Sequence, residues 1–367
     1  MNKKFFFSCF VCILIFFLAS TFFYNKQTVI KSENRYVTTF PQLPQKISTS
    51  KIKQYFRQVS EFYNDNFPNR EEIILTLTAF IPSIKNENIS YDKVVIGKDG
   101  WIFLGNNYNK TIDKLTGKIY YHNSDNKKYD TNTRCIYYRT IAEKILKHNK
   151  EIFFLIGPNK SSIYPEFLPK TVKPAQKTFH DELTQRMRQE GLTIYYPQQD
   201  LLQAKEKALL YYVTDTHWNN YGAFIVFINL LSQIDPNFCK VIKEEDFSFI
   251  PVKSFAGDLI NIGNLIFNDK NYQDNFDVFY KNIPIPTLNS VEKENNGVKI
   301  IQSTNPHALI NKTVWIIGDS FSVALRPYFS FFFKTMYFMH RNDFHSFADY
   351  SDIHADYVIY ESVERDF

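Results

Sequence analysis

Short apolar runs alternate with amphipathic stretches from about residue 134 to the end of the chain. Such runs, four or five residues long and without polar interruption, are typical of strands buried on both faces. They occupy residues 152–156, 192–196, 314–317, 336–339 and 357–360. Between them, apolar residues recur at helical spacing over 134–146, 177–190 and 221–231. Because strands alternate with helices, we predict an α/β fold with a parallel sheet that helices cover on both faces.

The chain before this region follows a different pattern. Residues 26–90 begin with a polar linker. Apolar residues then recur at helical spacing over 51–78, where Pro68 interrupts the pattern, and a second helical stretch covers 71–81. This pattern predicts a linker and a helical N-terminal region ahead of the main domain.

Residues 91–367 are predicted to form that main domain. A β-hairpin is predicted at 94–104, because glycines that favour a turn separate two short apolar runs. A polar stretch at 106–132 predicts a surface loop. The less regular stretch at about 240–310 predicts an insertion with short strands.

The N-terminal segment has the pattern of a membrane anchor. Lys3 and Lys4 precede residues 5–23, which contain no charged residue. About 20 apolar residues suffice to span a bilayer, and the basic flank stays on the cytoplasmic side. We therefore predict an uncleaved transmembrane helix within residues 1–25. A cleaved signal peptide is the alternative, and either one exports the rest of the chain.

Composition removes several classes of function. The net charge is only +5, and no dense basic cluster with interleaved aromatic residues occurs, so nucleic acid is not expected as a partner. No H-E-x-x-H motif occurs, and the single C-x-x-C lies in the apolar N-terminal segment, so no metal site is expected. Cys135 and Cys239 could form one disulfide or remain as free thiols.

One serine follows a predicted buried strand. Residues 314–317 are apolar, Gly318 and Asp319 break the pattern, and a helix is predicted to start after Ser320. A serine on such a turn has an accessible hydroxyl, and its N–H lies where a helix N-terminus favours an oxyanion. The same pattern also occurs as an ordinary turn with an N-cap serine. Ser320 is therefore a candidate nucleophile that needs a base.

His217 is the candidate base. Asp215 lies two residues before it, and this spacing lets a carboxylate reach Nδ1 while Nε2 faces the serine. The alternative is that Asp215 caps a helix and His217 is a packing residue. His354, with Asp352 two residues before it, is the rival base. His180 lies on an amphipathic helix and is expected at the surface.

These motifs together resemble a known family. Residues 215–219, Asp-Thr-His-Trp-Asn, and residues 318–320, Gly-Asp-Ser, resemble the SGNH-hydrolase-like polysaccharide O-acetyltransferases of the alginate O-acetylation type. Further stretches carry the same family resemblance, namely residues 97–104, 158–165, 257–259 and 358–365. The resemblance covers about residues 90–367, and it includes the permuted order in which Asp-x-His precedes Gly-Asp-Ser.

The resemblance implies an SGNH, flavodoxin-like fold and an O-acetyltransferase without a cofactor. Ser320 would take the acetyl group, His217 would act as the base, and Asp215 would orient it. Lys160 and Arg365 are candidate substrate contacts, and Lys160 and Glu361 are predicted just past strand ends, where sites of α/β folds lie. No second oxyanion donor is identified.

The expected partners also come from the resemblance. They are a polysaccharide acceptor and a membrane-bound O-acyltransferase that supplies acetyl groups, with the domain in the periplasm and the anchor in the inner membrane. Two other functions stay open. The same residues would serve a polysaccharide acetylesterase, or the chain could be an inactive carbohydrate-binding scaffold.

Overall fold

The computed structural model describes residues 29–30, 35–36, 38–44, 49–67, 92–119, 130–254, 257–263, 265, 272–285, 290–295, 298–344 and 353–367. The chain forms two compact units, Met1–Glu87 with Ile260–Asp269, and Asn88–Leu259 with Lys270–Phe367. The predicted anchor within residues 1–25 and the predicted helix at 71–81 lie outside the described residues. Among the helices that the structure describes, none is both long and apolar enough to cross a membrane.

In the first unit, β1 (Val29–Ile30) pairs antiparallel with β2 (Arg35–Tyr36). Helix α2 (Thr49–Asn66) follows, so the helix predicted at 51–78 is described only to Asn66, ahead of Pro68. Phe62 on α2 is buried, and its ring lies edge-on to Phe40 at 5.1 Å between ring centres.

The second unit is built on a seven-stranded sheet in the order β10-β11-β13-β12-β14-β5-β6. Its parallel part consists of β5 (Glu151–Gly157), β6 (Ile194–Tyr195), β12 (Ile310–Gly318), β13 (Phe333–His340) and β14 (Tyr357–Val363). β12 lies between β13 and β14. The carboxyl ends of the parallel strands share one edge of the sheet, as the sequence predicted.

The prediction of an all-parallel sheet is wrong at the other edge. β11 (Val298–Thr304) runs antiparallel to β13, and β10 (Val291–Asn295) runs antiparallel to β11. Only residues 305–309 separate β11 from β12. A parallel crossover needs a dozen or more residues, so this short connection cannot make one. Part of the predicted insertion at 240–310 therefore extends the main sheet, which is mixed.

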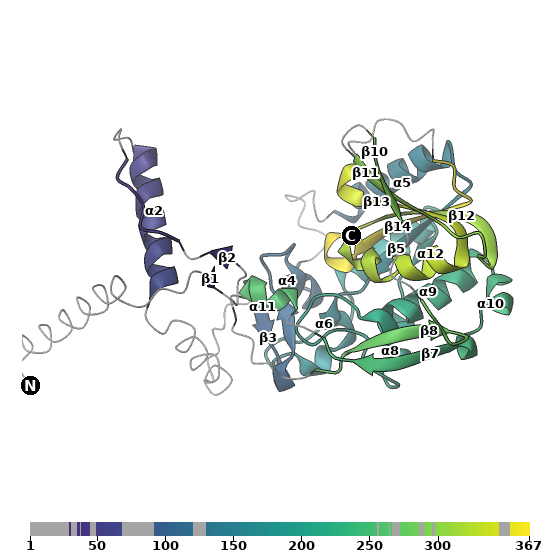
Figure 1. The fold of residues 1–367 in the computed structure, drawn as a ribbon, viewed down its shortest axis with the longest axis horizontal. Helices are drawn as coiled ribbons and strands as arrows, with labels where there is room; N and C mark the ends of the chain where they lie inside the picture. The colour runs from purple at the N-terminus through teal and green to yellow at the C-terminus, as the bar shows by residue number, and fades with distance from the viewer. Residues whose placement is uncertain are drawn as a thin grey trace, which may run out of the picture. The chain divides into compact units, whose positions relative to one another are not determined.

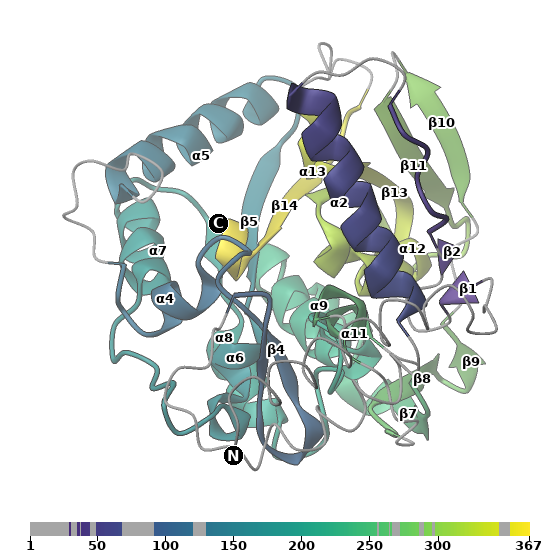
Figure 2. The same ribbon diagram turned by 90° about the vertical axis from the view of Figure 1, so that its left-hand side faces the viewer.

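Helices cover both faces of the sheet, which confirms that part of the prediction (Figure 1). One face packs against α5 (Thr131–Leu146), α7 (Phe179–Gln189) and α13 (Arg341–Phe344). The other packs against α8 (Gln198–Ala204), α9 (Asn220–Ile234) and α12 (Arg326–Phe332). Figure 2 shows α5 and α7 side by side. Helix α7 starts at a Thr178 capping box and stops at Gly191, whose φ of +79° suits glycine.

Several shorter elements complete this unit. The predicted hairpin is confirmed as β3 (Val94–Ile96) and β4 (Ile102–Leu104), joined by the turn η3 (Lys98–Gly100). The stretch 106–132 is not only a surface loop, because α4 (Thr111–Leu115) is mostly buried. The remaining short helices are α6 (Lys160–Ile163), η5 (Pro165–Phe167), α10 (Phe238–Val241), η6 (Glu244–Asp246), η7 (Ser320–Ala324) and η8 (Glu364–Asp366). Helix α11 (Asp258–Gly263) begins in this unit, and its residues from Ile260 onward belong to the first unit.

A small second sheet lies beside α9 and α12. It consists of β7 (Phe247–Val252), β8 (Asn275–Tyr280) and β9 (Ile283–Pro284), which pair antiparallel. Short strands were predicted in this region, although their direction was not. Aromatic side chains join it to the helices, with Phe249 4.9 Å from Phe224 and Tyr280 4.9 Å from Phe332 between ring centres. This packing fixes the position of β8 relative to the end of β12.

Two expectations about single residues are corrected by the fold. His180 is buried rather than at the surface, because it lies on the face of α7 that packs against the sheet. Burial lowers its pKa well below the usual value. Cys135 and Cys239 are both free thiols. They belong to the hydrophobic layers on opposite faces of the sheet, which rules out the disulfide.

Candidate active site

The nucleophile turn is the segment Gly318–Ser322 at the carboxyl end of β12. Gly318 leaves room for its neighbours, since an added Cβ would lie 2.8 Å from both Glu361 Oε2 and Ser322 Oγ. The Asp319 carboxylate accepts hydrogen bonds from the amides of Phe321 and Val363, each at 2.9 Å. Ser320 follows as the first residue of η7. The turn therefore continues a central strand and is closed by its own aspartate.

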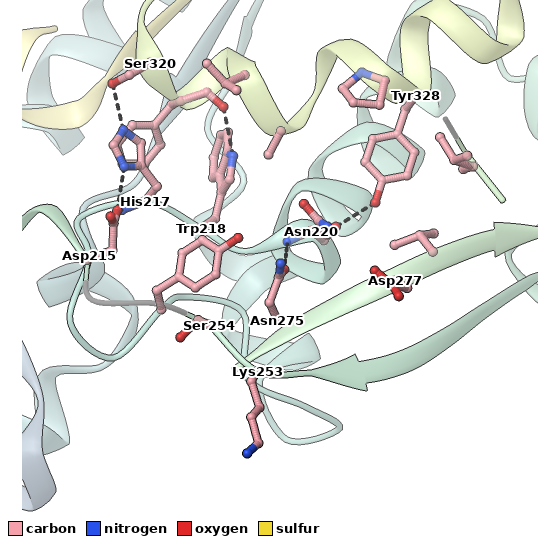
Figure 3. Close-up of a pocket in the computed structure, with 18 of the residues that line it drawn as sticks. Asp215, His217, Trp218, Asn220, Lys253, Ser254, Asn275, Asp277, Ser320 and Tyr328 are labelled. Atoms are coloured by element: carbon pink, nitrogen blue, oxygen red, sulfur yellow. Dashed lines mark hydrogen bonds and ion pairs between the residues drawn. The ribbon is translucent and has the colours of Figure 1, made fainter. Parts of the chain in front are cut away.

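The base segment, Tyr212–His217, brings the predicted base to this turn. His217 Nε2 lies 2.7 Å from Ser320 Oγ, and His217 Nδ1 lies 2.6 Å from Asp215 Oδ1. The Asp215 carboxylate also accepts the His217 backbone N–H at 2.9 Å. Figure 3 shows the three side chains in one row. The structure thus brings together all three residues that the sequence selected.

The row is electrostatically suited to proton transfer. Burial alone would raise the pKa of the Asp215 carboxyl, but hydrogen bonds from His217 and from the Asp258 amide outweigh it and hold the pKa below its usual value. Asp215 is therefore ionised at neutral pH and accepts a hydrogen bond from the Nδ1–H group of His217. Nε2 is then left as the acceptor for the Ser320 hydroxyl.

The residues after His217 tie the base segment to the nucleophile turn. The Trp218 indole N–H donates to the Phe321 carbonyl at 2.9 Å, and Trp218 is fully buried. Asn219, not Asp215, caps α9, because its side chain accepts the Gly222 amide at 2.8 Å. The alternative reading of Asp215 as a helix cap is therefore excluded.

Lys160 fixes the position of the base segment through hydrogen bonds to its backbone carbonyl groups. Its ammonium group donates to the carbonyl oxygens of Tyr212, Val213 and Asp215 at 2.9, 2.9 and 2.7 Å. The side chain is 4% exposed and lies over the Trp101 ring at 5.6 Å from its centre. Burial lowers the pKa of Lys160 to about 7. These contacts give Lys160 a positioning role, and the predicted contact with substrate stays a prediction.

Asp258 is a site residue that sequence reasoning did not select. Its amide donates to Asp215 Oδ2 at 2.9 Å, and its carboxylate accepts the amide and hydroxyl of Thr216 at 2.8 and 2.6 Å. Its Oδ2 lies 3.9 Å from His217 Nδ1, so a second carboxylate faces the base. The signal was Gly257: an added Cβ would lie 2.4 Å from the Thr214 carbonyl oxygen, which only glycine avoids.

Asp215, His217 and Asp258 are also the one group of potential metal ligands in the described part of the chain. Their donor atoms lie within 4.8 Å of one another. However, Asp215 is bonded to His217 and Asp258 is bonded to Thr216. A cation there would compete with the hydrogen bond that orients the base, so this arrangement fits proton transfer better than metal binding.

The other candidates occupy different positions. Arg365 donates to Asn159 Oδ1 at 3.2 Å, and its guanidinium lies 5.5 Å from the centre of the Phe321 ring, so it is near the nucleophile turn. Its contact with substrate stays a prediction. His354 precedes β14, at the opposite end of the parallel strands from Ser320, and lies 3.2 Å from the His148 carbonyl oxygen. Asp352 lies outside the described residues.

Glu361 lies inside β14 rather than past its end. It is fully buried, and its Oε2 accepts the Asp319 amide at 2.9 Å. Burial first, and then the nearby Asp319 carboxylate, raises the pKa of Glu361 well above its usual value. Glu361 therefore supports the nucleophile turn as a buried acid.

The Ser320–His217–Asp215 row opens into a cavity of about 940 Å³. Figure 3 shows that the row lies at one side of the cavity and that side chains from α12 and β8 lie at the other. The cavity is large enough for a sugar residue and its neighbours.

Solved structures of two known proteins are similar to this chain. The O-acetyltransferase domain of Pseudomonas putida AlgJ is 19% identical, with a TM-score of 0.45 over 74% of this chain and 91% of that chain. Bacillus cereus PatB1 with a sulfonyl adduct is 15% identical, with a TM-score of 0.52 over 75% of this chain and 96% of that chain. No curated protein matches the sequence.

A family model gives the most specific match. The model described as SGNH hydrolase-like domain, acetyltransferase AlgX, matches residues 94–332. This stretch contains Asp215, His217 and Ser320. The chain therefore belongs to the SGNH hydrolase-like acetyltransferases of the AlgX family, the kind of family that its motifs resemble.

Proposed function

We propose that this protein is an O-acetyltransferase that moves an acetyl group through a Ser320 acyl-enzyme to a hydroxyl of a bacterial polysaccharide. The observation that carries the proposal is the hydrogen-bonded row from Ser320 through His217 to Asp215 at the edge of the cavity. Membership of the AlgX family supports acetyl as the group that is transferred. An inactive scaffold would not need this row intact.

In the first half-reaction, Ser320 Oγ attacks the carbonyl carbon of an acetyl donor, and His217 Nε2 takes the hydroxyl proton. Asp215 stabilises the imidazolium that forms. The Ser320 amide makes no hydrogen bond to another described residue, so it can donate to the oxyanion. The leaving group then takes the proton from His217 and departs. Ser320 now carries the acetyl group as an ester.

In the second half-reaction, a sugar hydroxyl gives its proton to His217 Nε2 and attacks the acetyl carbon. The Ser320 oxygen leaves and regains the proton. Water could attack in the same way, which would make the protein an acetylesterase. The two activities share the acyl-enzyme and differ only in which acceptor the cavity holds.

The cellular setting is part of the same proposal. The basic residues Lys3 and Lys4 before the apolar stretch 5–23 support an inner-membrane anchor with the domain in the periplasm. A membrane-bound O-acyltransferase would supply the acetyl groups. This partner is inferred from the family resemblance alone.

The test uses the full chain, purified in detergent, with 4-nitrophenyl acetate as donor and oligosaccharides as acceptors. We expect a burst of 4-nitrophenol and an acetylated oligosaccharide in the mass spectrum. Ser320→Ala should remove both, whereas Ser232→Ala, at an exposed position on α9, should keep both. Release of acetate alone would favour the esterase. Equal activity of wild type and Ser320→Ala would overturn the proposal.

A further inference from the structure

The side of the cavity away from the serine is formed by one face of β8. Burial alternates along this strand, so Phe276, Val278 and Tyr280 pack into the core. Asn275, Asp277 and Phe279 lie on the other face, and all three line the cavity, as does Val278. Because the buried face is fixed by aromatic packing against α9 and α12, the polar face is held in a constant position.

Two asparagines on this side each use one half of their amide group to hold the wall together. Asn275 Oδ1 accepts the Asn220 amide at 3.1 Å, and Asn220 Nδ2 donates to the Phe276 carbonyl at 2.8 Å. Asn275 Nδ2 and Asn220 Oδ1 have no hydrogen-bond partner among the described residues. One donor and one acceptor are thus left at fixed positions, which suits sugar hydroxyls because a hydroxyl both donates and accepts.

The charge of this part of the cavity is unusual for a site that would bind an acidic polymer. Apart from Asp215 and His217, the charged residues that line it are Lys253 and Asp277. In Figure 3 the Lys253 side chain extends away from the other labelled side chains, whereas Asp277 lies on the strand that forms the wall. No arginine lines the cavity in the described part of the chain. The fixed charge offered to a ligand is therefore negative.

Apolar surface completes the wall across from β8. Val323 on η7 is 50% exposed, and Pro327 on α12 and Phe279 on β8 are half-buried. The C–H faces of a sugar ring can lie against such surfaces while its hydroxyls reach the asparagines. An ionised group on the ring would gain nothing from these apolar surfaces, and it would lose part of its hydration there.

We propose that this side of the cavity is an acceptor subsite that selects an uncharged sugar over a uronic acid, and that Asp277 is the residue that excludes the acid. The inference rests on the proposed function, because it assigns the acceptor of acetyl-Ser320. A neutral sugar can donate hydroxyl hydrogen bonds to the Asp277 carboxylate. A uronate in the same place would meet a like charge, and the one lysine that lines the cavity in the described part of the chain, Lys253, extends away from the other labelled side chains (Figure 3).

The chemistry is the same for either sugar. The hydroxyl oxygen forms the new bond to the acetyl carbon, the Ser320 ester bond breaks, and the hydroxyl proton passes through His217 Nε2 to Ser320. Selection therefore acts on binding of the acceptor and not on the acyl-enzyme. A burst of 4-nitrophenol without any acceptor reports the acyl-enzyme separately.

The test compares two acceptors that differ only at carbon 6, a glucose oligosaccharide and the same oligosaccharide oxidised to glucuronate. With the full-length wild type at low ionic strength, we expect kcat/KM for transfer to be at least about tenfold higher for the neutral acceptor. Asp277→Asn should lower the KM of the uronate and thereby reduce the ratio of the two kcat/KM values. Asp277→Lys should reduce this ratio further. Glu143→Gln, on the exposed surface of α5, should leave the ratio unchanged.

Three results would overturn the subsite. They are equal transfer to both acceptors, an unchanged ratio in both Asp277 variants, and a 4-nitrophenol burst without transfer to either saccharide. Absence of the burst itself would instead contradict the proposed function. The two failures are therefore distinguishable in one set of reactions.

Discussion

The base segment and the nucleophile turn each hold one half of the site, but they are held in different ways. The nucleophile turn continues β12, which is hydrogen-bonded to β13 and β14 on its two sides. The base segment is flanked by a single bridge, Tyr211 to Trp218, and pairs with no strand among the described residues. Its carbonyl groups are instead bonded to the ammonium of Lys160, and its Thr216 is bonded to Asp258.

The difference shows what each half needs from the rest of the chain. A turn at the end of a central strand inherits its position from the sheet, because ladder hydrogen bonds fix the strand on both sides. An irregular segment must have its polar backbone groups satisfied one at a time. The base segment therefore depends on two charged side chains, the buried Lys160 and the partly exposed Asp258. Loss of one of them should disturb the segment more than an equivalent loss at the turn.

The largest effects should come from removing the reacting groups themselves. Ser320→Ala and His217→Ala should each lower kcat by about 10⁴-fold or more, because both act in one proton transfer. The double variant should be no slower than either single variant. Burst kinetics with 4-nitrophenyl acetate measure this, and additive losses would mean that the two residues do not act as a unit.

Lys160→Met should disturb the base segment while leaving the nucleophile turn in place. It removes three hydrogen bonds and leaves the carbonyl groups of Tyr212 and Asp215 without a partner among the described residues, whereas that of Val213 still accepts the Ile102 amide. We therefore expect a loss of about 100-fold in kcat and about 2–4 kcal/mol in the free energy of unfolding. KM should change less, because Lys160 does not line the cavity. Lys205→Met is the matched control. Lys205 also donates to a backbone carbonyl, that of Ile163, but does not reach the base segment.

A control as slow as Lys160→Met would show that the loss is general and not specific to the base segment. Chemical denaturation of both variants separates an effect on the site from partial unfolding.

Asp258→Asn should have a smaller effect on the same segment. The backbone bond from residue 258 to Asp215 can remain, but the second carboxylate facing His217 is lost. We expect kcat to fall by about three- to tenfold with little change in KM, since the imidazolium loses one stabilising charge. Transfer kinetics measure the change. An effect equal to that of Lys160→Met would mean that the charge, and not the position of the segment, dominates.

The smallest effect concerns the nucleophile turn and depends on pH. The pKa of Glu361 is raised above the usual value of 4.5 in the folded chain, so between that value and the raised one the folded state binds more protons than the unfolded state. The contribution of Glu361 to stability is therefore complete below pH 4.5 and is lost as the pH rises. Glutamine cannot titrate at this position.

The free energy of unfolding of the wild type, minus that of Glu361→Gln, should thus fall between pH 5 and 7, by at most about 1.4 kcal/mol per pH unit. Denaturant titrations at each pH measure it, with Glu143→Gln as the exposed control. A difference that stays constant with pH would contradict a buried neutral acid at Glu361.

The same contrast explains what the sequence could predict. Ser320, and the strands on either side of it, carry a local signal of apolar run, glycine and serine. Asp215 and His217 were found because their spacing is itself local. Lys160 and Asp258 contact residues more than 40 positions away, so no local pattern predicts that they hold the base segment. The same limit applies to His180, whose burial follows from the packing of α7.

The sheet shows the limit for the fold. Runs of apolar residues predicted the five parallel strands well. The strand β10, Val-Glu-Lys-Glu-Asn, has no such run, and its direction follows from pairing with β11. Pairing partners are not encoded in periodicity, so the antiparallel edge was not predicted.

The order of the two halves along the chain also has a consequence for when the enzyme becomes reactive. His217 and Ser320 are 103 residues apart, and the strand that positions Ser320 pairs with β14 at the end of the described chain. Contacts of such long range form late, because chain entropy must be lost before they contribute. The serine should therefore remain an ordinary alcohol during synthesis and export, and it should become a nucleophile only when the whole sheet has closed.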